Sequence, residues 1–518
     1  MKKDIAIIGG GIGGVLAAIT AAKLGQHVVL TEETAWIGGQ LTSQAVPPDE
    51  HPWIETFGCT KTYRTFRNEV RDYYKRNYPM KEDVRRNDRL NPGNGWVSRI
   101  AHEPRVSLAI LYDFLQPYIS NGQVEILLQH KPVRAEVVGD EVRHIVVVDT
   151  MTQDERLIEA EIFLDATELG DVLPLARVDY VVGAESRADT DETNALAETN
   201  PQDIQSFTHV MALDYLEGGD FTIEKPAMYD FWRNYQASFL DHIQLSEYIP
   251  DAHTGQSKKM PIFTKGGSFG MWEYRRIIDK AQYTDGFFVG DVSLINWPQN
   301  DYWLGSIIDV SEADKQKHLA EARQLSLSLL YWLQTEAPHS GGKGYPGFRL
   351  RPDVVGTKDG LAMHPYIRES RRIKAMYTVT ENDINADLRG NSGVVQHENS
   401  VGVGAYRIDL HPTTAHNRLF YAKSYPFEIP LGSLIPVKVK NLLPACKNIG
   451  TTQLTNGCFR VHPVEWNIGE SAGALAAFSL KNGVKPLQVY GDPKLTSAFQ
   501  DILVELGVSL HWPEVHAF

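Results

Sequence analysis

The first thirty residues change from an apolar run to a helical repeat and back again. Residues 5–8 are short and continuously apolar, as a fully buried strand is, and residues 28–30 have the same character. Between them, small apolar residues recur at the spacing of one helix face: Ala17, Ala18, Ala21 and Leu24. Gly25 follows where such a helix can end. The pattern therefore predicts a strand–helix–strand unit.

Later segments add further strands and two longer helices. Residues 122–150 read as short strands with Gly139–Asp140 as a hairpin turn, and Ile162–Leu164 as one more buried strand. Apolar and aromatic residues at helical spacing over residues 63–74 predict a helix that faces the core. Residues 312–336 predict a long amphipathic helix, which we interpret as scaffold or subunit contact.

A helix made of small residues is predicted near the end of the chain. Asn441–Pro444 reads as a strand, followed by a loop and then by a helix over Pro463–Phe478. Gly469 and Gly473 share one face of that helix, with small alanines beside them. A core helix normally carries leucines there, so some other part of the molecule must come very close to it.

The glycines between the first strand and the first helix form a GxGxxG motif. Gly9 is expected to make a tight turn, Gly11 to let a pyrophosphate approach, and Gly14 to let helix and strand pack. Glu32 lies 18 residues past Gly14, where a carboxylate accepts ribose hydroxyls. The order of these pieces favours a dinucleotide site over a glycine-rich turn. Two neighbouring residues complete the contacts that we predict here: Gly13 and Glu33.

A second glycine pair follows the acid, in the stretch "TAWIGGQLTSQ". Gly38 and Gly39 permit another close approach between backbone and ligand. The pair resembles the loop that runs along the flavin in the glutathione-reductase-type FAD fold, and nicotinamide domains usually lack it. The resemblance implies FAD as the cofactor, whereas the glycines by themselves are also compatible with an ordinary turn. The predicted contacts of this loop continue through Gln40, Leu41 and Thr42.

The strand Ile162–Leu164 runs into a polar turn. In the FAD fold that the chain resembles, a β-meander leads back to an Ala-Thr-Gly strand end beside the cofactor. Here Glu168 replaces that glycine, and it needs a positive φ only if the turn is the usual one. The resemblance implies cofactor contacts at Ala166, Thr167, Gly170 and Asp171.

The small-residue helix resembles the last helix of the same fold, whose N-terminus points at the flavin pyrimidine ring. The resemblance implies that the helix end, helped by Arg460 or His462, stabilises the negative charge that develops as flavin accepts hydride. Gly469 and Gly473 would then be contacts where strand, cofactor and helix crowd together. Simple helix packing through small residues is the alternative.

Together these motifs resemble the FAD-dependent oxidoreductase family, near the fumarate-reductase and thiazole-synthesis-type flavoproteins. Segments such as "NWPQNDYWLG" and "YRIDLHP" narrow the resemblance to a bacterial branch, over nearly the whole chain. The implied fold class is α/β: a glutathione-reductase-like, Rossmann-type FAD domain (a ββα sandwich with a β-meander) plus an inserted α+β substrate domain. We expect the FAD domain at residues 1–180, with a helical insertion near 55–95, and at 436–518, and the substrate domain at 181–435.

Residues 181–435 contain no second dinucleotide fingerprint, and the three cysteines form no CxxC motif. We therefore expect no separate NAD(P)H domain and no dithiol chemistry. Reduced flavin would pass its electrons to oxygen or to a separate acceptor. Transient binding of NADPH, as in some single-domain flavoprotein hydroxylases, stays open.

Three polar clusters of the substrate region are candidates for chemistry. "LINWPQNDYWLGS" interleaves amides and acids with aromatics, which suits a polar, ring-shaped ligand, and Asn300 is its candidate catalytic residue. "HPYIRESRRI", if helical, places Arg368 and Arg372 on one face beside Arg371, and arginine can hold a carboxylate. "YRIDLHP" suggests a strand that turns polar side chains inward, His411 among them. Packed aromatics, an ion-paired helix surface and a structural histidine are the simpler alternatives.

Composition and charge exclude several other classes. The chain carries 51 basic and 65 acidic residues, a net charge of −14, and this balance indicates neither nucleic acid nor an anionic membrane as a partner. No stretch of 18 or more apolar residues predicts a membrane span, and Asp4 interrupts the start of any signal peptide. Few cysteines fit a reducing cytoplasm, and we expect no metal. A covalent flavin bond to Cys59 is a minor alternative, and a homo-oligomer is possible.

We therefore expect an FAD enzyme that takes hydride from a C–H bond of a small polar substrate, which then carries C=O, C=N or C=C. His411 or His462 would take the O–H or N–H proton, and Arg368 or Arg371 would orient the substrate. Two other functions stay open: a NAD(P)H-dependent flavoprotein hydroxylase, and a protein that holds FAD without catalysis.

Overall fold

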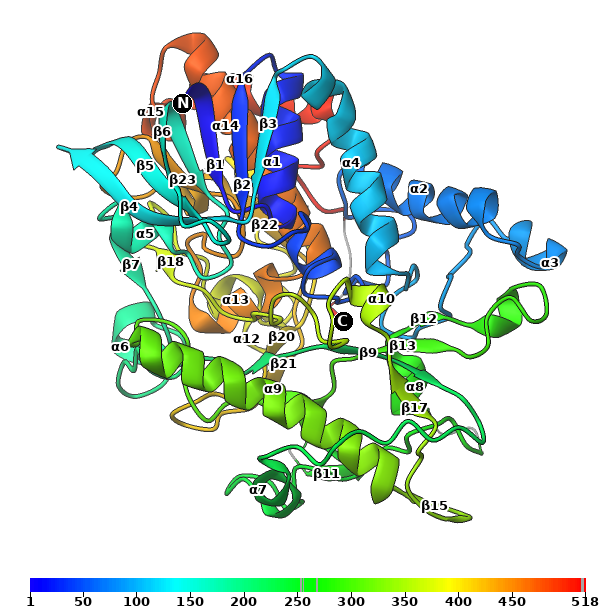
Figure 1. The fold of residues 1–518 in the computed structure, drawn as a ribbon. Coiled ribbons are helices and arrows are strands. Elements are labelled where there is room, and N and C mark those ends of the chain that lie inside the picture. Colours follow the sequence, from blue (N-terminus) through cyan, green and yellow to red (C-terminus); the bar gives the residue numbers. More distant parts are fainter. Residues whose placement is uncertain (252–253, 255, 267–268, 514–516) are drawn as a thin grey trace.

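The computed structural model describes residues 1–251, 254, 256–266, 269–513 and 517–518 (Figure 1). The predicted strand–helix–strand unit is confirmed as β1 (Lys2–Ile8), α1 (Ile12–Lys23) and β2 (Val28–Glu32). β1 and β2 are parallel, with Ile5 opposite Val28. Both strands are buried from Ile5 and Val28 onward, which explains why their sequences are apolar without alternation.

The central sheet has seven strands in the order β3-β2-β1-β6-β5-β4, with β23 also paired to β6. β3, β2, β1, β6 and β23 are parallel, whereas β4, β5 and the first half of β6 form an antiparallel meander. The predicted hairpin turn at Gly139–Asp140 joins β4 to β5. β6 is far longer than the predicted 162–164, because one strand serves both parts of the sheet. The added strands are β3 (Val124–Leu128), β4 (His130–Val138), β5 (Glu141–Asp149), β6 (Glu155–Asp165) and β23 (Leu442–Pro444).

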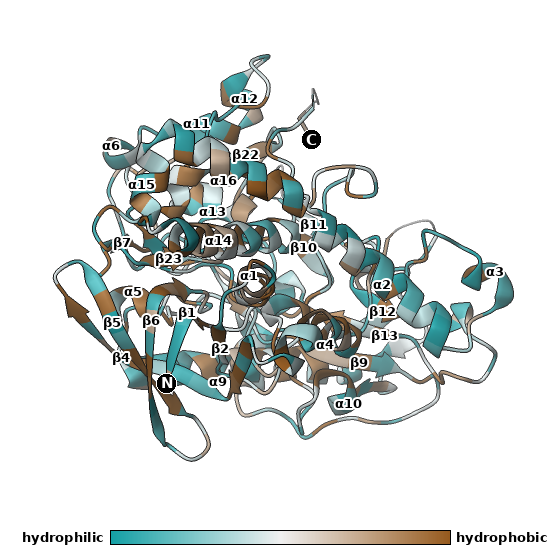
Figure 2. Cartoon of the chain, turned by 90° about the horizontal axis from the view of Figure 1, so that it is seen from above, coloured by the Kyte–Doolittle hydropathy of each residue, from teal (hydrophilic) through white to brown (hydrophobic). Residues whose placement is uncertain are grey.

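The small-residue helix is α14 (His462–Asn482), which begins one residue before the prediction and ends at Gly483, whose φ is +64°. It packs against α1, and Figure 2 shows the two helices side by side. α4 (Pro104–Ser120) lies on another side of α1. α15 (Pro486–Gly491) and α16 (Pro493–Leu506) cover the outer end of α14.

The loop predicted between β23 and α14 is wrong in one part, because it contains α13 (Gln453–Phe459). The side chain of its N-cap, Thr452, accepts a hydrogen bond from Thr455 N. Polar side chains then attach the helix to its surroundings: Thr455 donates to Val379 O at 2.7 Å, and Asn456 donates to Lys447 O at 2.8 Å. One of these contacts, to Val379, comes from a distant segment, and no apolar periodicity in the sequence indicates the helix.

A second, antiparallel sheet has the order β12-β13-β9-β17. The predicted helix over 312–336 is confirmed as α9 (Glu312–Thr335), which packs against α7 (Tyr229–Asn234) and β17. Figure 1 shows α9 and α7 at the end of the molecule away from the seven-stranded sheet, with α13, β20 and β21 between. The strands are β9 (Met211–Tyr215), β12 (Arg276–Ile278), β13 (Val292–Ile295), β17 (Phe348–Leu350), β20 (Ile408–Leu410) and β21 (Phe420–Ala422).

The predicted core-facing helix over 63–74 is confirmed within α2 (Lys61–Asn77). The remaining helices are α3 (Glu82–Arg85), α5 (Val172–Leu175), α6 (Arg187–Thr190), α8 (Met271–Tyr274), α10 (Pro352–Val355), α11 (Glu381–Ile384) and α12 (Ala386–Arg389). The remaining strands are β7 (Tyr180–Val181), β8 (Phe207–Thr208), β10 (Tyr248–Pro250), β11 (Ser257–Lys259), β14 (Asp301–Tyr302), β15 (Pro338–His339), β16 (Gly342–Lys343), β18 (Arg372–Ile373), β19 (Ser400–Gly404) and β22 (Phe427–Pro430).

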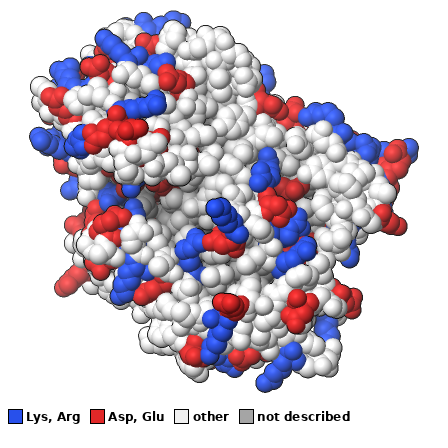
Figure 3. Space-filling model, viewed as in Figure 1, with Lys and Arg blue, Asp and Glu red and all other residues white. Residues whose placement is uncertain are grey.

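Acidic and basic side chains are interspersed on the face of the molecule seen in Figure 3. Of the helices in the described part of the chain, none combines the length and the apolar character that a membrane crossing requires.

Candidate cofactor site and the adjoining cavity

The glycine motif forms the turn between β1 and α1, and neighbouring backbone leaves almost no space for side chains there. Gly9 has a φ of +102°, and a Cβ there would lie 2.5 Å from Thr167 N at the end of β6. A Cβ on Gly14 would lie 3.0 Å from the Cβ of Ala166. Side chains at either position would separate α1 from the sheet, so both glycines hold the helix N-terminus at the carboxyl end of the parallel strands.

The carboxylate of Glu32 lies at the end of β2 and faces this turn. Its Oε2 accepts a hydrogen bond from Gly10 N at 3.0 Å, and its Oε1 accepts two from Thr34, through N at 2.8 Å and Oγ1 at 2.7 Å. Burial, together with the neighbouring Glu33, raises the pKa of Glu32 to about 7. Glu32 therefore links the glycine loop to the second strand at the position that the motif predicts.

Glu33 forms an ion pair with His364, whose Nε2 lies 2.8 Å from Glu33 Oε1. Burial works against both charges, but the hydrogen bond outweighs it: the pKa of Glu33 is lowered to about 2 and that of His364 is raised to about 9. The pair joins the end of β2 to the segment that follows α10.

A narrow hollow, which we call the cradle, lies between these groups at the carboxyl ends of β1, β2 and β6. Its lining consists of Gly9, Gly11, Glu32, Glu33, Gly39, Ser43, Gln44, His130, Pro132, Ala166, Thr167, Glu168, Asp171 and His364. Many predicted cofactor contacts thus meet in one place, although they come from separate segments of the chain.

Glu168, the residue that departs from the Ala-Thr-Gly pattern, reaches into the cradle. Its Oε1 lies 2.8 Å from the place of a Gly11 Cβ and 2.7 Å from that of a Gly39 Cβ. Its Oε2 pairs with the buried ammonium of Lys447, which also lies 3.5 Å from Glu465 Oε1. An anionic oxygen therefore rests on the two glycines.

The cradle residues fit the diphosphate and ribose of a dinucleotide. Gly11 and Gly39 leave a surface that accepts an anionic oxygen, as the carboxylate of Glu168 shows. Gln44 Nε2 is buried and lacks a hydrogen-bond partner among the described residues, so a donor is present for a ligand. Among those same residues, no three His, Cys, Asp or Glu side chains are grouped as metal ligands would be.

The second glycine pair has the backbone that glycine permits: φ is +104° at Gly38 and +50° at Gly39. The following side chains hold this loop instead of lining the cradle. Gln40 Nε2 donates to Arg460 O at 2.9 Å, Thr42 Oγ1 donates to Ile37 O at 2.5 Å, and Leu41 is part of the core. These three side chains are therefore not placed to contact the cofactor directly.

In the turn after β6, the left-handed residue is Gly170, with a φ of +66°, and not Glu168. The side chain of Thr167 accepts a hydrogen bond from Asp171 N at 2.6 Å, which closes the turn. Thr167 and Asp171 line the cradle, whereas a Cβ on Gly170 would lie 3.0 Å from Arg371 O. The glutamate is tolerated because the turn needs its glycine two residues later.

The close neighbour of the small-residue helix is α1, and this corrects the expectation that the cofactor crowds it. A Cβ on Gly469 would lie 2.6 Å from Gly13 Cα, and one on Gly473 would lie 2.7 Å from Ala17 Cα. The backbones of α1 and α14 are thus in direct contact. None of Gly13, Gly469 and Gly473 lines the cradle.

His462 also needs correction, because it is neither a cation nor a free base. Its Nδ1 accepts a hydrogen bond from Asp49 N at 3.1 Å, and its Nε2 lies 3.1 Å from Val46 O, to which it donates. Burial lowers the pKa of His462 to about 4. The imidazole is neutral and holds residues 46–49 in place.

A cavity of about 240 Å³, which we call the central cavity, lies beyond Arg460. It adjoins an outer cavity of about 520 Å³, since residues such as Tyr274, Tyr406 and His411 line both. The lining of the central cavity is Asp49, Ile249, Met260, Met271, Tyr274, Arg275, Asn296, Trp297, Pro298, Tyr366, Arg368, Tyr406, Asp409, His411 and Arg460. Members of all three polar clusters meet here.

His411 stands between two carboxylates at the cavity wall. Its Nδ1 lies 2.6 Å from Asp301 Oδ2, and its Nε2 lies 3.7 Å from Asp409 Oδ2. Arg368 Nη2 lies 2.9 Å from the other oxygen of Asp301. Burial would raise the pKa of Asp301, but Arg368 and His411 outweigh it and lower this pKa to about 2. Asp301 is therefore an anion that orients the imidazole.

Arg460 links the central cavity to the loop of the second glycine pair. Its Nη1 donates to the hydroxyl of Tyr366 at 2.8 Å and its Nη2 to Asp409 O at 3.0 Å. Burial opposes its charge, but Tyr366 and Asp409 outweigh this and raise the pKa of Arg460. Arg460 is thus a permanent cation just before α14, where the sequence analysis predicts a positive charge.

Asn300 and Arg371 are corrected from candidate catalytic residues to structural ones. Asn300 is fully buried: its Oδ1 accepts from Trp297 N at 2.8 Å, and its Nδ2 donates to Ile295 O at 3.1 Å. Arg371 pairs with Asp171 at 3.0 Å and with Asp309 at 2.8 Å. Neither side chain lines the central cavity.

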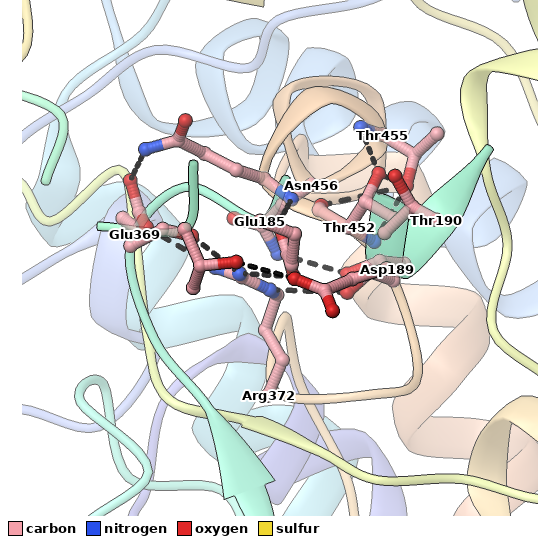
Figure 4. A network of polar contacts seen from close by, with 12 residues as sticks. Glu185, Asp189, Thr190, Glu369, Arg372, Thr452, Thr455 and Asn456 are labelled. Carbon is pink, nitrogen blue, oxygen red and sulfur yellow. Dashed lines mark hydrogen bonds and ion pairs between the residues drawn. The ribbon is translucent and has the colours of Figure 1, made fainter. Parts of the chain in front are cut away.

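The segment "YIRESRRI" is not helical, so its arginines do not share a face. Arg372 begins β18 and points away from the cavity, into a buried network with Glu185 and Glu369 (Figure 4). Each arginine of the segment has its own carboxylate, and these partners lie on different elements. Ion pairs therefore determine the backbone conformation of this segment.

Some cavity residues were missed by the sequence analysis, and one of its alternatives, a bond at Cys59, does not fit the structure. Asp49, Tyr274 and Arg275 line the central cavity, yet no motif in the sequence marked them. Cys59 lines neither the cradle nor the central cavity, and burial raises the pKa of its thiol to about 11. A covalent flavin bond at Cys59 has no geometric support.

A comparison with protein families identifies the family of this chain. A family described as FAD dependent oxidoreductase matches residues 4–503, nearly the whole chain. A curated relative, an NADH oxidase of Thermoanaerobacter brockii, is 46% identical over 61 residues, which are 11% of this chain and 9% of the relative. The chain thus matches less than a tenth of that relative's length.

Solved structures with some similarity are flavoenzymes at low identity. OxyS anhydrotetracycline hydroxylase from Streptomyces rimosus is 11% identical, with 98% of this chain and 67% of that chain covered and a TM-score of 0.35. THI4 of Thermovibrio ammonificans is 17% identical, with 36% and 67% covered and a TM-score of 0.23. L-proline dehydrogenase from P. horikoshii is 16% identical, with 36% and 24% covered and a TM-score of 0.18.

Proposed function

The chain belongs to the FAD dependent oxidoreductase family, and from this membership we propose that it takes hydride from a C–H bond of a small polar substrate bound in the central cavity. The observation that carries the proposal is the His411–Asp301 pair at the cavity wall. A base with a fixed tautomer beside a cavity is the arrangement that proton removal requires. Bound FAD would accept the hydride.

The chain's own residues would manage the proton and the charge. Asp301 holds Nδ1–H of His411, which leaves Nε2 to take the O–H or N–H proton of the substrate as the C–H bond breaks. Arg368 fixes Asp301 from the other side. Arg460 supplies positive charge next to the loop of Gln40.

We assign the cofactor to the cradle. Glu32 would accept the ribose hydroxyls, and Gly11 and Gly39 would receive the diphosphate, with Lys447 behind it.

For the fold, we propose the glutathione-reductase-like subtype, which is supported by five parallel strands joined to the β4–β5–β6 meander. The corresponding division is an FAD domain at 1–180 and 436–518 around a substrate domain at 181–435, supported by a central sheet whose strands come from 2–165 and 442–444.

The direct test is anaerobic reduction of the bound flavin by a panel of sugars, hydroxy acids, amines and amino acids. At least one class should bleach the flavin of the purified protein, and His411→Asn should slow that bleaching while FAD content is kept. Bleaching that is equally fast in His411→Asn would remove the assigned base. Reoxidation by oxygen, compared with added acceptors, would then identify where the electrons go.

A second candidate is a flavoprotein reduced by NAD(P)H, such as a hydroxylase. The short stretch of 46% identity with an NADH oxidase is the observation that favours it. The missing second dinucleotide fingerprint in 181–435 weighs against it. Stopped-flow mixing with NADH and NADPH separates the two, because only the second candidate is reduced rapidly without another substrate.

A further inference from the structure

Arg275 is a buried cation in the wall of the central cavity, and two of its side-chain donors have no acceptor in the part of the chain that the structure describes. It follows α8 and precedes β12, and it is 7% exposed. Its Nε and Nη1 atoms are buried and make no hydrogen bond to any residue that the structure describes. The nearest carboxylate oxygen, Asp49 Oδ1, lies 3.7 Å from Nη1, beyond hydrogen-bonding distance. A guanidinium with unused donors therefore borders the cavity.

The other two arginines of the cavity differ from Arg275 in degree: Nε of each also lacks a partner among the described residues, but their Nη atoms make hydrogen bonds. Arg368 contacts Asp301 at 2.9 Å and donates to Thr208 Oγ1 at 2.9 Å. Arg460 donates to Tyr366 and to the backbone of Asp409. Burying a charge without hydrogen-bonded partners is costly, and the ion pair of Arg275 with Asp49 supplies no hydrogen bond. The open donors of Arg275 fit a partner that arrives with the ligand.

The surroundings of Arg275 suit an anion with a compact, partly apolar body. Its guanidinium carbon lies 5.2 Å from the ring centre of Tyr274, which holds the cation by its aromatic face. Trp297, Met260 and Met271 add apolar surface to the same cavity. About 240 Å³ is less than the roughly 300–1,000 Å³ of pockets for drug-sized ligands. A small acid matches both the volume and the lining.

We propose that Arg275 binds the carboxylate of the substrate, so that the oxidised molecule is a small carboxylic acid. The assignment rests on the central cavity being the substrate site. A carboxylate would supply an acceptor for the guanidinium of Arg275. The substrate's C–H bond would then be oriented within the cavity that His411 also borders.

The test measures binding directly, on purified holoprotein. Acetate, glycolate and benzoate are titrated alongside their uncharged amides, with tryptophan fluorescence and the flavin absorption spectrum as readouts. Carboxylates should bind and the amides should bind at least about tenfold more weakly, since hydrogen bonds to charged groups are the stronger ones. Equal binding of acids and amides, or no binding of any acid, would overturn the assignment without any variant.

Two variants locate the contact. Arg275→Gln should weaken carboxylate binding about tenfold to hundredfold, and Arg275→Lys should retain part of it. Arg323→Gln is the matched control, because Arg323 is a half-exposed arginine paired with Asp359 outside the cavity. Undiminished carboxylate affinity in Arg275→Gln overturns the proposal. Loss of FAD from Arg275→Gln overturns it too, because Arg275 would then belong to the cofactor site.

Binding and turnover test the two proposals separately. If acids bind through Arg275 but no compound bleaches the flavin, the assignment of Arg275 stands and the proposed hydride transfer fails. If sugars or amines without a carboxylate bleach the flavin and acids do not bind, the proposed function stands and the assignment of Arg275 fails.

Discussion

Nδ1 of His411 and Oδ2 of Asp301 lie 2.6 Å apart at the wall of the central cavity. Asp301 is almost completely buried, and Arg368 and Thr208 bind its other oxygen. With its pKa lowered to about 2 against the effect of burial, Asp301 is an anion at neutral pH. One nitrogen of the imidazole is thereby fixed as a donor, and the other, Nε2, lies 3.7 Å from Asp409 Oδ2 and is the atom that we propose as the base.

The first prediction concerns this pair. His411→Asn should slow anaerobic flavin reduction by about a hundredfold to ten-thousandfold, the usual contribution of a general base. Asp301→Asn should slow it as well, since an amide no longer dictates which nitrogen carries the proton. FAD content should be unchanged in both. The control is His416→Asn, a half-exposed histidine 3.4 Å from Asp203 that lines neither cavity; an equal loss of rate there would refute the assignment.

The second prediction concerns the glycine loop. Gly11→Val should yield protein without yellow colour, because a Cβ there already meets Glu168 Oε1 at 2.8 Å and the larger side chain would cover the cradle. Flavin absorbance per mole of protein is the measurement. Gly491→Val is the control, since a Cβ at Gly491 has no neighbour within 4 Å. Full FAD occupancy in Gly11→Val would contradict the assignment of FAD to the cradle.

The third prediction concerns the contact of α1 with α14. Gly473→Leu should lower the free energy of unfolding by about 1–3 kcal/mol or more, because its Cβ would lie 2.7 Å from Ala17 Cα and neither backbone can move freely. Since α1 carries the glycine loop, FAD content should fall as well. Thermal unfolding and flavin absorbance are compared with those of Lys481→Leu, an exposed position on the same helix. Equal stability of the two variants would contradict direct backbone contact.

The fourth prediction concerns pH and the Glu33–His364 pair. The pKa of His364 is raised from 6.5 to about 9, so its contribution to stability is complete below pH 6.5 and is lost as the pH rises through 9. His364→Gln should therefore be less stable than the wild type near pH 6, and the difference should shrink toward pH 10. Unfolding temperatures across this range provide the measurement, with His416→Gln as the control. A difference that stays constant with pH would show that His364 is not charged in the folded protein.

The strand–helix–strand start could be predicted because its signals are local. Residues 5–8 and 28–30 are apolar runs, and the glycines between them fall where the backbone has no clearance. The same applies to α2 and α9, whose apolar faces repeat at helical spacing. The helix α13 could not be predicted, since no apolar periodicity marks it and the hydrogen bond from Thr455 that stabilises it goes to the remote Val379.

The candidate site was only partly accessible from the sequence. His411 and Arg368 stood in polar clusters and Arg460 just before the small-residue helix, and all three border one cavity. His462 looked equally suited to chemistry, but its charge depends on burial against Val46 and Asp49, which no local pattern reveals. Arg275 was missed because Glu273 and Arg276 stand beside it, so the segment resembles an ordinary charged surface until the fold encloses Arg275.

The carboxylate of Glu168 lies on the same two glycines that we assign to the diphosphate of the cofactor. Under that proposed assignment, a ligand oxygen would compete with this carboxylate for Gly11 and Gly39 and for the ammonium of Lys447. The affinity for the cofactor would then be the difference between two anions on one surface.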